Sequence, residues 1–231
     1  MAKILFGAGV ADARNKLGGH VFSKNRNGAY IRQKVSPTQP RSPAQLIVRS
    51  SFGSFSKAWG GTLSDLQRSG WTSLASSNPV PDQFGNPQVL TGLQFYQRVN
   101  RNLHTIGAIR LDDAPPDQSV EGLTSLSATA TFTGSVLTVT FTPSPLDAEM
   151  HLVIAATPEL SPGRSFFTAF LKLVFADLND LTTSGLSIYT PWNALFGALQ
   201  PGQKIGLSAY VINDTNGAAS TPAGASVITG A

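Results

Sequence analysis

The sequence of 231 residues contains no cysteine, and only 13% of its residues are charged. The absence of cysteine excludes disulfides, thiolate metal sites and a cysteine nucleophile. No apolar run approaches the roughly 20 residues that a membrane-spanning helix needs, and the first residues lack the apolar core and cleavage site of a signal peptide. We therefore expect a soluble chain that has no membrane segment and is not secreted through a signal peptide.

Residues that favour turns are abundant. The chain holds 22 glycines and 15 prolines, and 41% of its residues are hydrophobic, which is enough for a core. This composition favours many turns and short strands over long helices. The length allows two domains, and the patterns described below predict an α+β fold class.

Charge divides the chain into two halves of opposite sign. Up to Leu111 there are 14 basic and three acidic residues, a net charge of +11; after it there are three basic and ten acidic residues, a net charge of −7. Such asymmetry indicates that the basic half lies against an acidic surface or nucleic acid.

Residues 1–42 are predicted to form a basic N-terminal arm with a hairpin. The pair Asn27 and Gly28 is the dipeptide that most favours a two-residue hairpin turn. Pro37, Pro40 and Pro43 then keep the chain extended. The residues expected to contact a partner are Lys24, Arg26, Tyr30, Arg32, Lys34, Arg41 and Arg49.

Residues 43–111 are predicted to form a small helical domain. A first helix, 43–59, has Ser42 as its N-cap, and Gly60 and Gly61 end it. A second helix runs to about residue 76 with Ser64 and Gln67 as a capping box, and Thr91 caps a third. The expected apolar positions are Leu46, Val48, Phe52, Phe55 and Trp59 in the first helix, Trp71 and Leu74 in the second, and Leu93, Phe95, Tyr96, Val99, Leu103 and Ile106 in the third.

Residues 112–119 contain two adjacent prolines and read as an acidic linker, after which residues 120–231 carry strand patterns. The strands are expected at 128–132, 136–141, 151–156, 166–175, 206–212 and 225–229. Gly134 and Ser135 predict a turn between the first two. Short strands at this spacing predict a β-sandwich of two sheets.

Two resemblances follow from particular segments. Residues 199–202, 205–213 and 217–222 resemble the last two strands of a fibronectin type III or other immunoglobulin-like domain. The N-terminal half resembles a family of uncharacterised proteins from tailed bacteriophages and prophages. The matching residues are Gly18, Gly19, 22–26, Gly28, Tyr30, Arg32, Pro37, Pro40, Ala44, Gln45, Val48, Arg49, Trp59, Leu63, Ser64, Gln67, Arg68, Trp71, Phe84, Gly85, 90–92, Asn100 and Leu103. The phage resemblance implies a particle component and supplies no catalytic residues.

Reactive groups form no recognisable catalytic pattern. His20, His104 and His151 lie outside any Gly-x-Ser-x-Gly motif, and Asp177 and Asp180 fit a loop better than a glycosidase cleft. Gly7 and Gly9 begin a dinucleotide-like pattern that Asp12 interrupts. The carboxylates Asp112, Asp113, Asp117 and Glu121 offer a possible calcium site, but they lack the spacing of a known calcium loop.

We therefore expect a structural, non-enzymatic component of a bacteriophage virion, most simply a capsid-associated decoration or cement protein anchored by its basic N-terminal part. Two alternatives remain open: a tail, neck or baseplate protein, and a DNA-binding protein that uses the basic half. The expected partners are other virion proteins, with the chain present in many copies or as a homo-oligomer, and nucleic acid is a further candidate. No cofactor, metal, membrane or small-molecule substrate is expected, and the expected location is the virion, assembled in the host cytoplasm.

Overall fold

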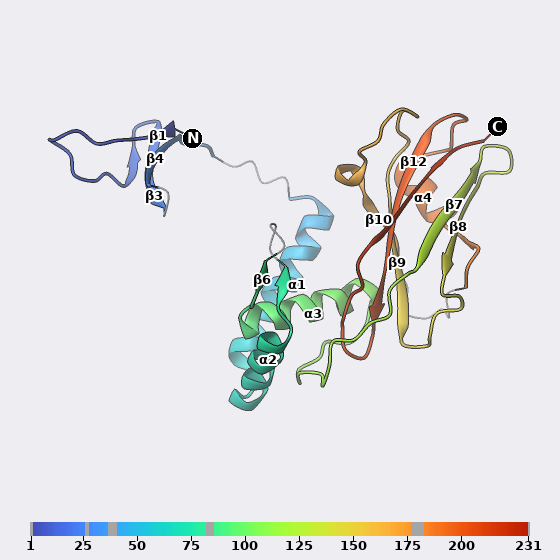
Figure 1. Cartoon of the computed structure of the whole chain (residues 1–231), viewed down its shortest axis with the longest axis horizontal. Coiled ribbons are helices and arrows are strands. Elements are labelled where there is room, and N and C mark those ends of the chain that lie inside the picture. Colours follow the sequence, from blue (N-terminus) through green and yellow to red (C-terminus); the bar gives the residue numbers. More distant parts are fainter. Residues whose placement is uncertain (1, 26–27, 37–40, 82–85, 177–182, 231) are drawn as a thin grey trace. The chain divides into compact units, whose positions relative to one another are not determined.

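The computed structural model describes residues 2–25, 28–36, 41–81, 86–176 and 183–230. These residues form a mixed α+β structure with four α-helices and several antiparallel sheets (Figure 1). The chain divides into two compact units, Met1–Leu46 and Ile47–Ala231. The division lies four residues after the expected boundary at residue 42, inside the first turn of a helix, and the two units are described separately.

The first unit is a four-stranded antiparallel sheet in the order β1-β4-β3-β2. Its strands are β1 (Ala2–Lys3), β2 (Asn15–Leu17), β3 (His20–Asn25) and β4 (Gly28–Gln33). The expected hairpin is therefore present as β3 and β4. Its turn is shifted by one residue, because Asn25 pairs with Gly28 and Gly28 is thus the first residue of β4. Arg26 and Asn27 lie outside the described residues.

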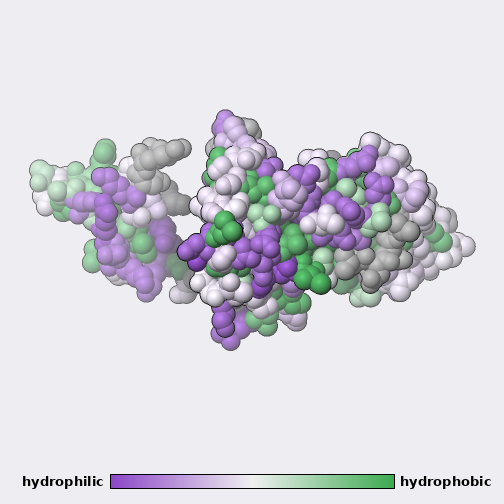
Figure 2. All heavy atoms as spheres, turned by 90° about the horizontal axis from the view of Figure 1, so that it is seen from below, coloured by the Kyte–Doolittle hydropathy of each residue, from purple (hydrophilic) through white to green (hydrophobic). Residues whose placement is uncertain are grey.

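This sheet has no core of its own among the residues that the structure describes. None of residues 4–24, 28–36 and 41–46 is buried; each is half-buried or exposed. Leu5, Leu17 and Val35 are 100%, 71% and 68% exposed. Hydrophobic and hydrophilic residues accordingly both appear on the surface of this unit in Figure 2. A sheet without a buried face gains little stability from the hydrophobic effect.

Helix α1 (Pro43–Gly61) begins as the sequence predicts, since the amide of Gln45 donates to Ser42 Oγ at 3.4 Å. Gly60 and Gly61 are the last two residues of the helix, which therefore runs two residues past the predicted end at residue 59. The predicted apolar stripe is only partly correct. Phe55 is buried and Trp59 is half-buried, but Leu46, Val48 and Phe52 are 48%, 36% and 41% exposed.

The predicted capping box of α2 is confirmed, and the predicted cap Thr91 is part of a second box at the start of α3. Helix α2 (Asp65–Ser77) starts after Ser64, whose hydroxyl accepts from the amide of Gln67, while the Gln67 side chain accepts from the amide of Ser64. Thr91 and Gln94 make the same pair of bonds at the start of α3 (Gly92–Ile106). These bonds satisfy amides that have no partner within a helix. A two-stranded ladder, β5 (Val80–Pro81) with β6 (Pro87–Gln88), lies between the two helices in the sequence.

Aromatic side chains form the centre of the helical core. Trp71 and Tyr96 are fully buried with their rings perpendicular at 5.3 Å, and Phe55 contacts the same tyrosine edge-on at 6.4 Å. The buried members of this core are Phe55, Ala58, Leu63, Trp71, Leu74, Ala75, Phe95, Tyr96, Val99 and Leu103. The helical prediction for residues 43–111 thus agrees with the elements and with most of the side chains expected to pack.

The remaining strands form two antiparallel sheets that share one hydrophobic core. One sheet has the order β11-β8-β7 and the other β10-β9-β12-β13. Their bounds are β7 (Ser125–Thr131), β8 (Val136–Thr142), β9 (Met150–Ala156), β10 (Lys172–Ala176), β11 (Leu186–Ser187), β12 (Lys204–Asn213) and β13 (Ala223–Ile228). Leu137, Val139 and Phe141 from β8 pack in the same core as Leu152 and Ile154 from β9. The alternation that predicted a half-buried β8 is therefore confirmed.

The predicted strand 166–175 is wrong in its first half. Thr168–Phe170 is a short 3₁₀ helix, and only Lys172–Ala176 pairs with β9. Helix α4 (Tyr189–Phe196) and strand β11 were not expected. Trp192 of α4 is fully buried in the shared core, and its Nε1 donates to Thr157 O at 2.9 Å. Helix α4 thus contributes a large aromatic side chain to the core between the two sheets.

Residues 112–119 are bonded to both the helices and the β part, unlike a solvated linker. Trp71 Nε1 donates to Asp112 O at 2.9 Å, and Asn216 Nδ2 donates to Ser119 O at 2.9 Å. Ile106 of α3 also packs with Val153 and Ile212, which lie on β9 and β12. The helices from residue 47 onward and the β part therefore belong to one unit.

Candidate interaction surface

The predicted partner-contact residues fall on both faces of the first unit's sheet. In an antiparallel pair, directly opposite residues point to the same face. Arg32 lies opposite Val21, which lies opposite Lys16, and Tyr30 lies opposite Ser23. Lys16, Tyr30 and Arg32 therefore share a face, which we call the Tyr30 face.

Lys24 lies on the other face of the same sheet. Its cross-strand partner is Ala29, and Phe22 lies opposite Ile31 on that face. The structure thus separates Lys24 from Tyr30 and Arg32, which the sequence reading grouped around a single hairpin. The physical reason is the two-residue period of a strand: side chains of successive residues point to opposite faces. Lys24 and Phe22 of β3 therefore point to the face opposite Tyr30.

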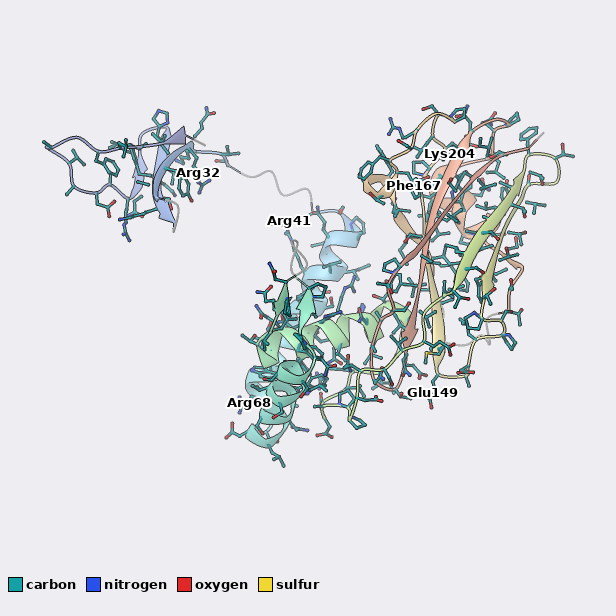
Figure 3. All side chains as sticks on the ribbon, in the orientation of Figure 1. Arg32, Arg41, Arg68, Glu149, Phe167 and Lys204 are labelled. Carbon is teal, nitrogen blue, oxygen red and sulfur yellow. The ribbon has the colours of Figure 1, made fainter. Side chains whose placement is uncertain are left out.

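The other predicted contact residues are dispersed. Lys34 follows β4, its amide donates to Gly19 O at 2.9 Å, and its side chain is exposed. Arg41 is exposed just before α1 and is labelled with Arg32 in Figure 3. Arg49 is exposed on α1 within the second unit. Arg26 lies outside the described residues.

Lys16 is a surface cation that the sequence reading did not select. Strand β2 has only three residues, all exposed, and no apolar alternation marks it. Lys16 lies on the same face as Arg32 only because β2 pairs with β3. Gly18 and Gly19 lie between β2 and β3, and they were the one local signal of a chain turn there.

Histidines offer no catalytic arrangement in the part of the chain that the structure describes. His151 is buried in β9 with Nε2 at 3.2 Å from Asp214 Oδ2, a close approach that lacks hydrogen-bond geometry. His104 lies in α3 beside Arg101, and His20 lies in β3. No serine or threonine hydroxyl is bonded to any of these rings among the hydrogen bonds of the described residues.

Carboxylates at the junction of helices and sandwich have separate partners. Asp112 pairs with Arg110 at 2.7 Å, and Asp113 accepts from Gln67 at 2.9 Å. Asp117 accepts from Ser119 and Asn216, and these hydrogen bonds hold its pKa below the usual value. No group of three or more potential metal-binding carboxylates or histidines occurs among the described residues. Asp177 and Asp180 lie outside them.

The glycine pattern near the N-terminus does not form a dinucleotide turn. The segment from Gly7 to Asp12 is not followed by a helix, and Asp12 pairs with Arg14 at 3.1 Å. A phosphate-binding turn needs the N-terminus of a helix, which supplies free amides. Across the described residues no helix is both long and apolar enough to cross a membrane.

Comparison with known proteins yields a weak structural likeness and no relative by sequence. No model of a known protein family matches the chain, and no curated protein matches it. Among solved structures it is similar to an Fn3-like protein from Clostridium thermocellum, with 15% identity and a TM-score of 0.30 over 48% of this chain and 94% of that one.

Proposed function

We propose that the protein is a structural, non-enzymatic component of a bacteriophage particle, most simply a decoration or cement protein of the capsid. One observation carries the proposal: a four-stranded sheet with no buried residue in its described part is joined to a unit that has two substantial cores. Such a sheet is stabilised when a partner covers one of its faces, because burial of apolar area is the main favourable term in association.

Charge indicates the kind of partner. Residues 1–46 contain eight basic residues and one acidic residue, so the first unit has a formal charge of +7. A surface of this sign favours an acidic partner and speeds the encounter with it. An acidic capsid shell meets this requirement, and the resemblance of the N-terminal half to phage proteins supports the same choice.

We assign the β part to the immunoglobulin-like class of sandwich. Its sheets contain three and four strands, and consecutive strands β7 and β8 pair in one sheet while β9, β12 and β13 pair in the other. This distribution is that of a seven-stranded immunoglobulin-like or fibronectin type III domain. In the proposed particle the sandwich projects from the shell while the first unit anchors the protein.

The sites of attachment are tested on particles. Virions carrying the wild-type protein are washed at stepwise salt, and the released protein is quantified. A Lys16→Ala/Arg32→Ala variant, which alters the Tyr30 face, is expected to leave the particle at lower salt, because fewer charge pairs hold it. A Lys24→Ala/Arg41→Ala variant removes the same charge and serves as the matched control, because Lys24 lies on the other face and Arg41 lies outside the sheet. Absence of the wild-type protein from purified virions contradicts the proposal, and release from tails instead of capsids favours a tail, neck or baseplate position.

A DNA-binding role is the second candidate, favoured by the Tyr30 face alone. There an aromatic ring shares a surface with Lys16 and Arg32, the combination that binds single strands by stacking and phosphate contacts. If it holds, the full chain binds DNA in a filter assay with an affinity that falls steeply with salt. Tyr30→Ala then weakens binding by about 1–3 kcal/mol. Equal binding by the wild type and the Lys16→Ala/Arg32→Ala variant rejects this role.

A further inference from the structure

The β part of the second unit concentrates its charges at opposite ends of its strands. Residues 112–231 contain only three basic residues, Arg164, Lys172 and Lys204. Lys204 is the first residue of β12, and Lys172 pairs with Ala156 at the last position of β9. Glu149 precedes the first residue of β9, and Asp214 follows the last residue of β12. At about 3.3 Å per residue, β12 separates the two sets of charges by about 30 Å.

The first set forms a basic-aromatic end, which we define as Arg164, Phe166, Phe170, Lys172 and Lys204. Lys204 Nζ donates to Arg164 O at 2.9 Å, and the Arg164 guanidinium lies 4.7 Å from the centre of the Phe170 ring. These contacts hold Arg164 and Lys204 together despite their mutual repulsion, while Lys172 Nζ lies 5.2 Å from the centre of the Phe196 ring. The carboxylate of Glu159 at this end already accepts a hydrogen bond from the amide of Gln200.

Exposed aromatic rings make this end suited to a protein partner. Phe166 is 65% exposed and Phe170 is 40% exposed. Both line an open hollow of about 580 Å³ together with Arg164 and Ala169. Arginine beside aromatic rings is the composition that is enriched in protein–protein interfaces.

The loop that carries these rings is fixed to the sheet. Phe167 packs directly over Gly206 of β12, where a side chain of any other residue would collide with the ring. Figure 3 labels Phe167 and Lys204, which lie near each other at one end of the sandwich, while Glu149 lies at the other. The basic-aromatic end is therefore presented on a rigid support, which lowers the entropic cost of binding.

The second set forms an acidic end, which we define as Asp147, Glu149 and Asp214. Asp147 and Glu149 are exposed on the connection between β8 and β9. The amide of Asp214 donates to Glu149 O at 2.9 Å, which ties this connection to the end of β12. Three carboxylates thus lie at the end of the sandwich opposite the three cations.

We propose that the basic-aromatic end binds the acidic end of a second copy of this chain. Charge complementarity selects this partner, since every copy has three cations at one end and, about 30 Å away, the exposed carboxylates of Asp147 and Glu149. The two surfaces differ, so the contact is head-to-tail and each copy retains a free surface for the next one. The exposed rings of Phe166 and Phe170 supply apolar area that is buried in the contact. The complementary charges orient one copy relative to the next. This inference is independent of the particle role proposed for the first unit.

The test measures self-association of the full chain by sedimentation velocity at several concentrations, at low and high salt. The wild type is expected to increase in average mass with concentration and to dissociate as salt rises. Arg164→Glu/Lys172→Glu and Asp147→Lys/Glu149→Lys, each alone, are expected to weaken association more than about tenfold, because like charges then meet. An equimolar mixture of the two variants is expected to regain association, since each then offers the charge that the other lacks.

Regained association in the mixture supports the proposal, and it also shows that both variants are folded. A wild type that stays monomeric at every concentration overturns it. Association that is insensitive to both variants overturns it too, and then another surface, such as the first unit, joins the copies. Loss of association with the basic-aromatic variant alone, while the acidic variant behaves as wild type, also overturns it, because the partner is then something other than this acidic end.

Discussion

Gly217 lies directly against Val99 of α3. A Cβ on Gly217 would be 2.5 Å from Val99 Cγ1 and 3.0 Å from Val99 O, and the φ angle of this glycine is +66°. The Gly217 carbonyl also accepts a hydrogen bond from Asn102 Nδ2 at 2.9 Å. The turn after β12 and the middle of α3 therefore fit together only because residue 217 has no side chain.

Gly217→Ala should destabilise the second unit by about 2–4 kcal/mol, because the left-handed backbone and the collision with Val99 both cost free energy. The measurement is urea unfolding followed by tryptophan fluorescence. Gly224→Ala is the matched control, since its Cβ would come no closer than 4.0 Å to Leu207 O. Equal stabilities of the two variants would contradict the packing of this turn on α3.

Tyr96→Phe should be neutral or stabilise the protein by about 1 kcal/mol, because it removes a buried hydroxyl that has no partner. Tyr96 is 0% exposed, and its hydroxyl makes no hydrogen bond among the described residues. The ring itself contacts Trp71 and Phe55, so Tyr96→Ala should cost about 3–5 kcal/mol. Chemical unfolding of both variants checks the pair, and a clearly destabilised Tyr96→Phe would mean that the hydroxyl is bonded in solution.

The same tyrosine should respond to alkaline pH. Burial raises the pKa of Tyr96; the charge of Arg110 lowers it by a smaller amount, and the charge of Asp112 raises it further. Its neutral form is therefore favoured by folding, and the associated stability is full below the unfolded pKa of about 10 and lost as pH rises through the folded value. Wild type should lose stability more steeply than Tyr96→Phe above about pH 10, and parallel curves would refute the role of this group.

Replacing either capping residue should weaken its helix. Ser64→Ala and Thr91→Ala should each cost about 1 kcal/mol, since each hydroxyl satisfies an amide at the third helical position. Ser73→Ala is the control, because Ser73 is exposed inside α2 and alanine favours a helix. Thermal or urea unfolding compares the stabilities of the three variants. If Ser64→Ala and Thr91→Ala are as stable as Ser73→Ala, the two caps do not form in solution.

Asp117 should titrate below its usual range. Hydrogen bonds from Ser119 and Asn216 lower the pKa of this carboxyl, so the stability they contribute is present above the unfolded pKa and lost as pH falls through the folded one. An NMR titration should give a midpoint below the reference value of 3.8. Ser119→Ala should move the midpoint up, while Ser127→Ala, whose hydroxyl is bonded to Thr140, should leave it unchanged.

Elements with strong local signals were predictable. The Ser64–Gln67 capping box, the Thr91 cap and strand β8 are encoded within a few neighbouring residues, and all three are present where expected. The shift of the hairpin turn by one residue changes the cross-strand partner of each residue by two positions, so Lys24 lies opposite Ala29 and not Ile31, but every residue keeps its face. Pairing of β3 with β4 determined that Lys24 and Arg32 lie on different faces.

Other features depend on residues distant in the sequence. The segment before β10 looks like a strand locally, yet Phe167 turns onto Gly206 and the chain forms a 3₁₀ helix instead. Val48 and Phe52 follow the period of α1 but have too few neighbours to be buried. Residues 112–119 read as a linker because nothing local reveals their bonds to Trp71 and Asn216.

The amino-acid sequence by itself determined helices α1, α2 and α3, most strands, the division of charge and the lack of cysteine chemistry, since these depend on composition and short-range pattern. Only the tertiary structure decided which cations share a face, that the first unit has no core in its described part, and that the cations of the sandwich gather at one end. Pairing register and packing bring together residues such as Arg164 and Lys204, 40 positions apart. A pattern of neighbouring residues cannot predict such contacts, because the contacting residues are far apart in the sequence.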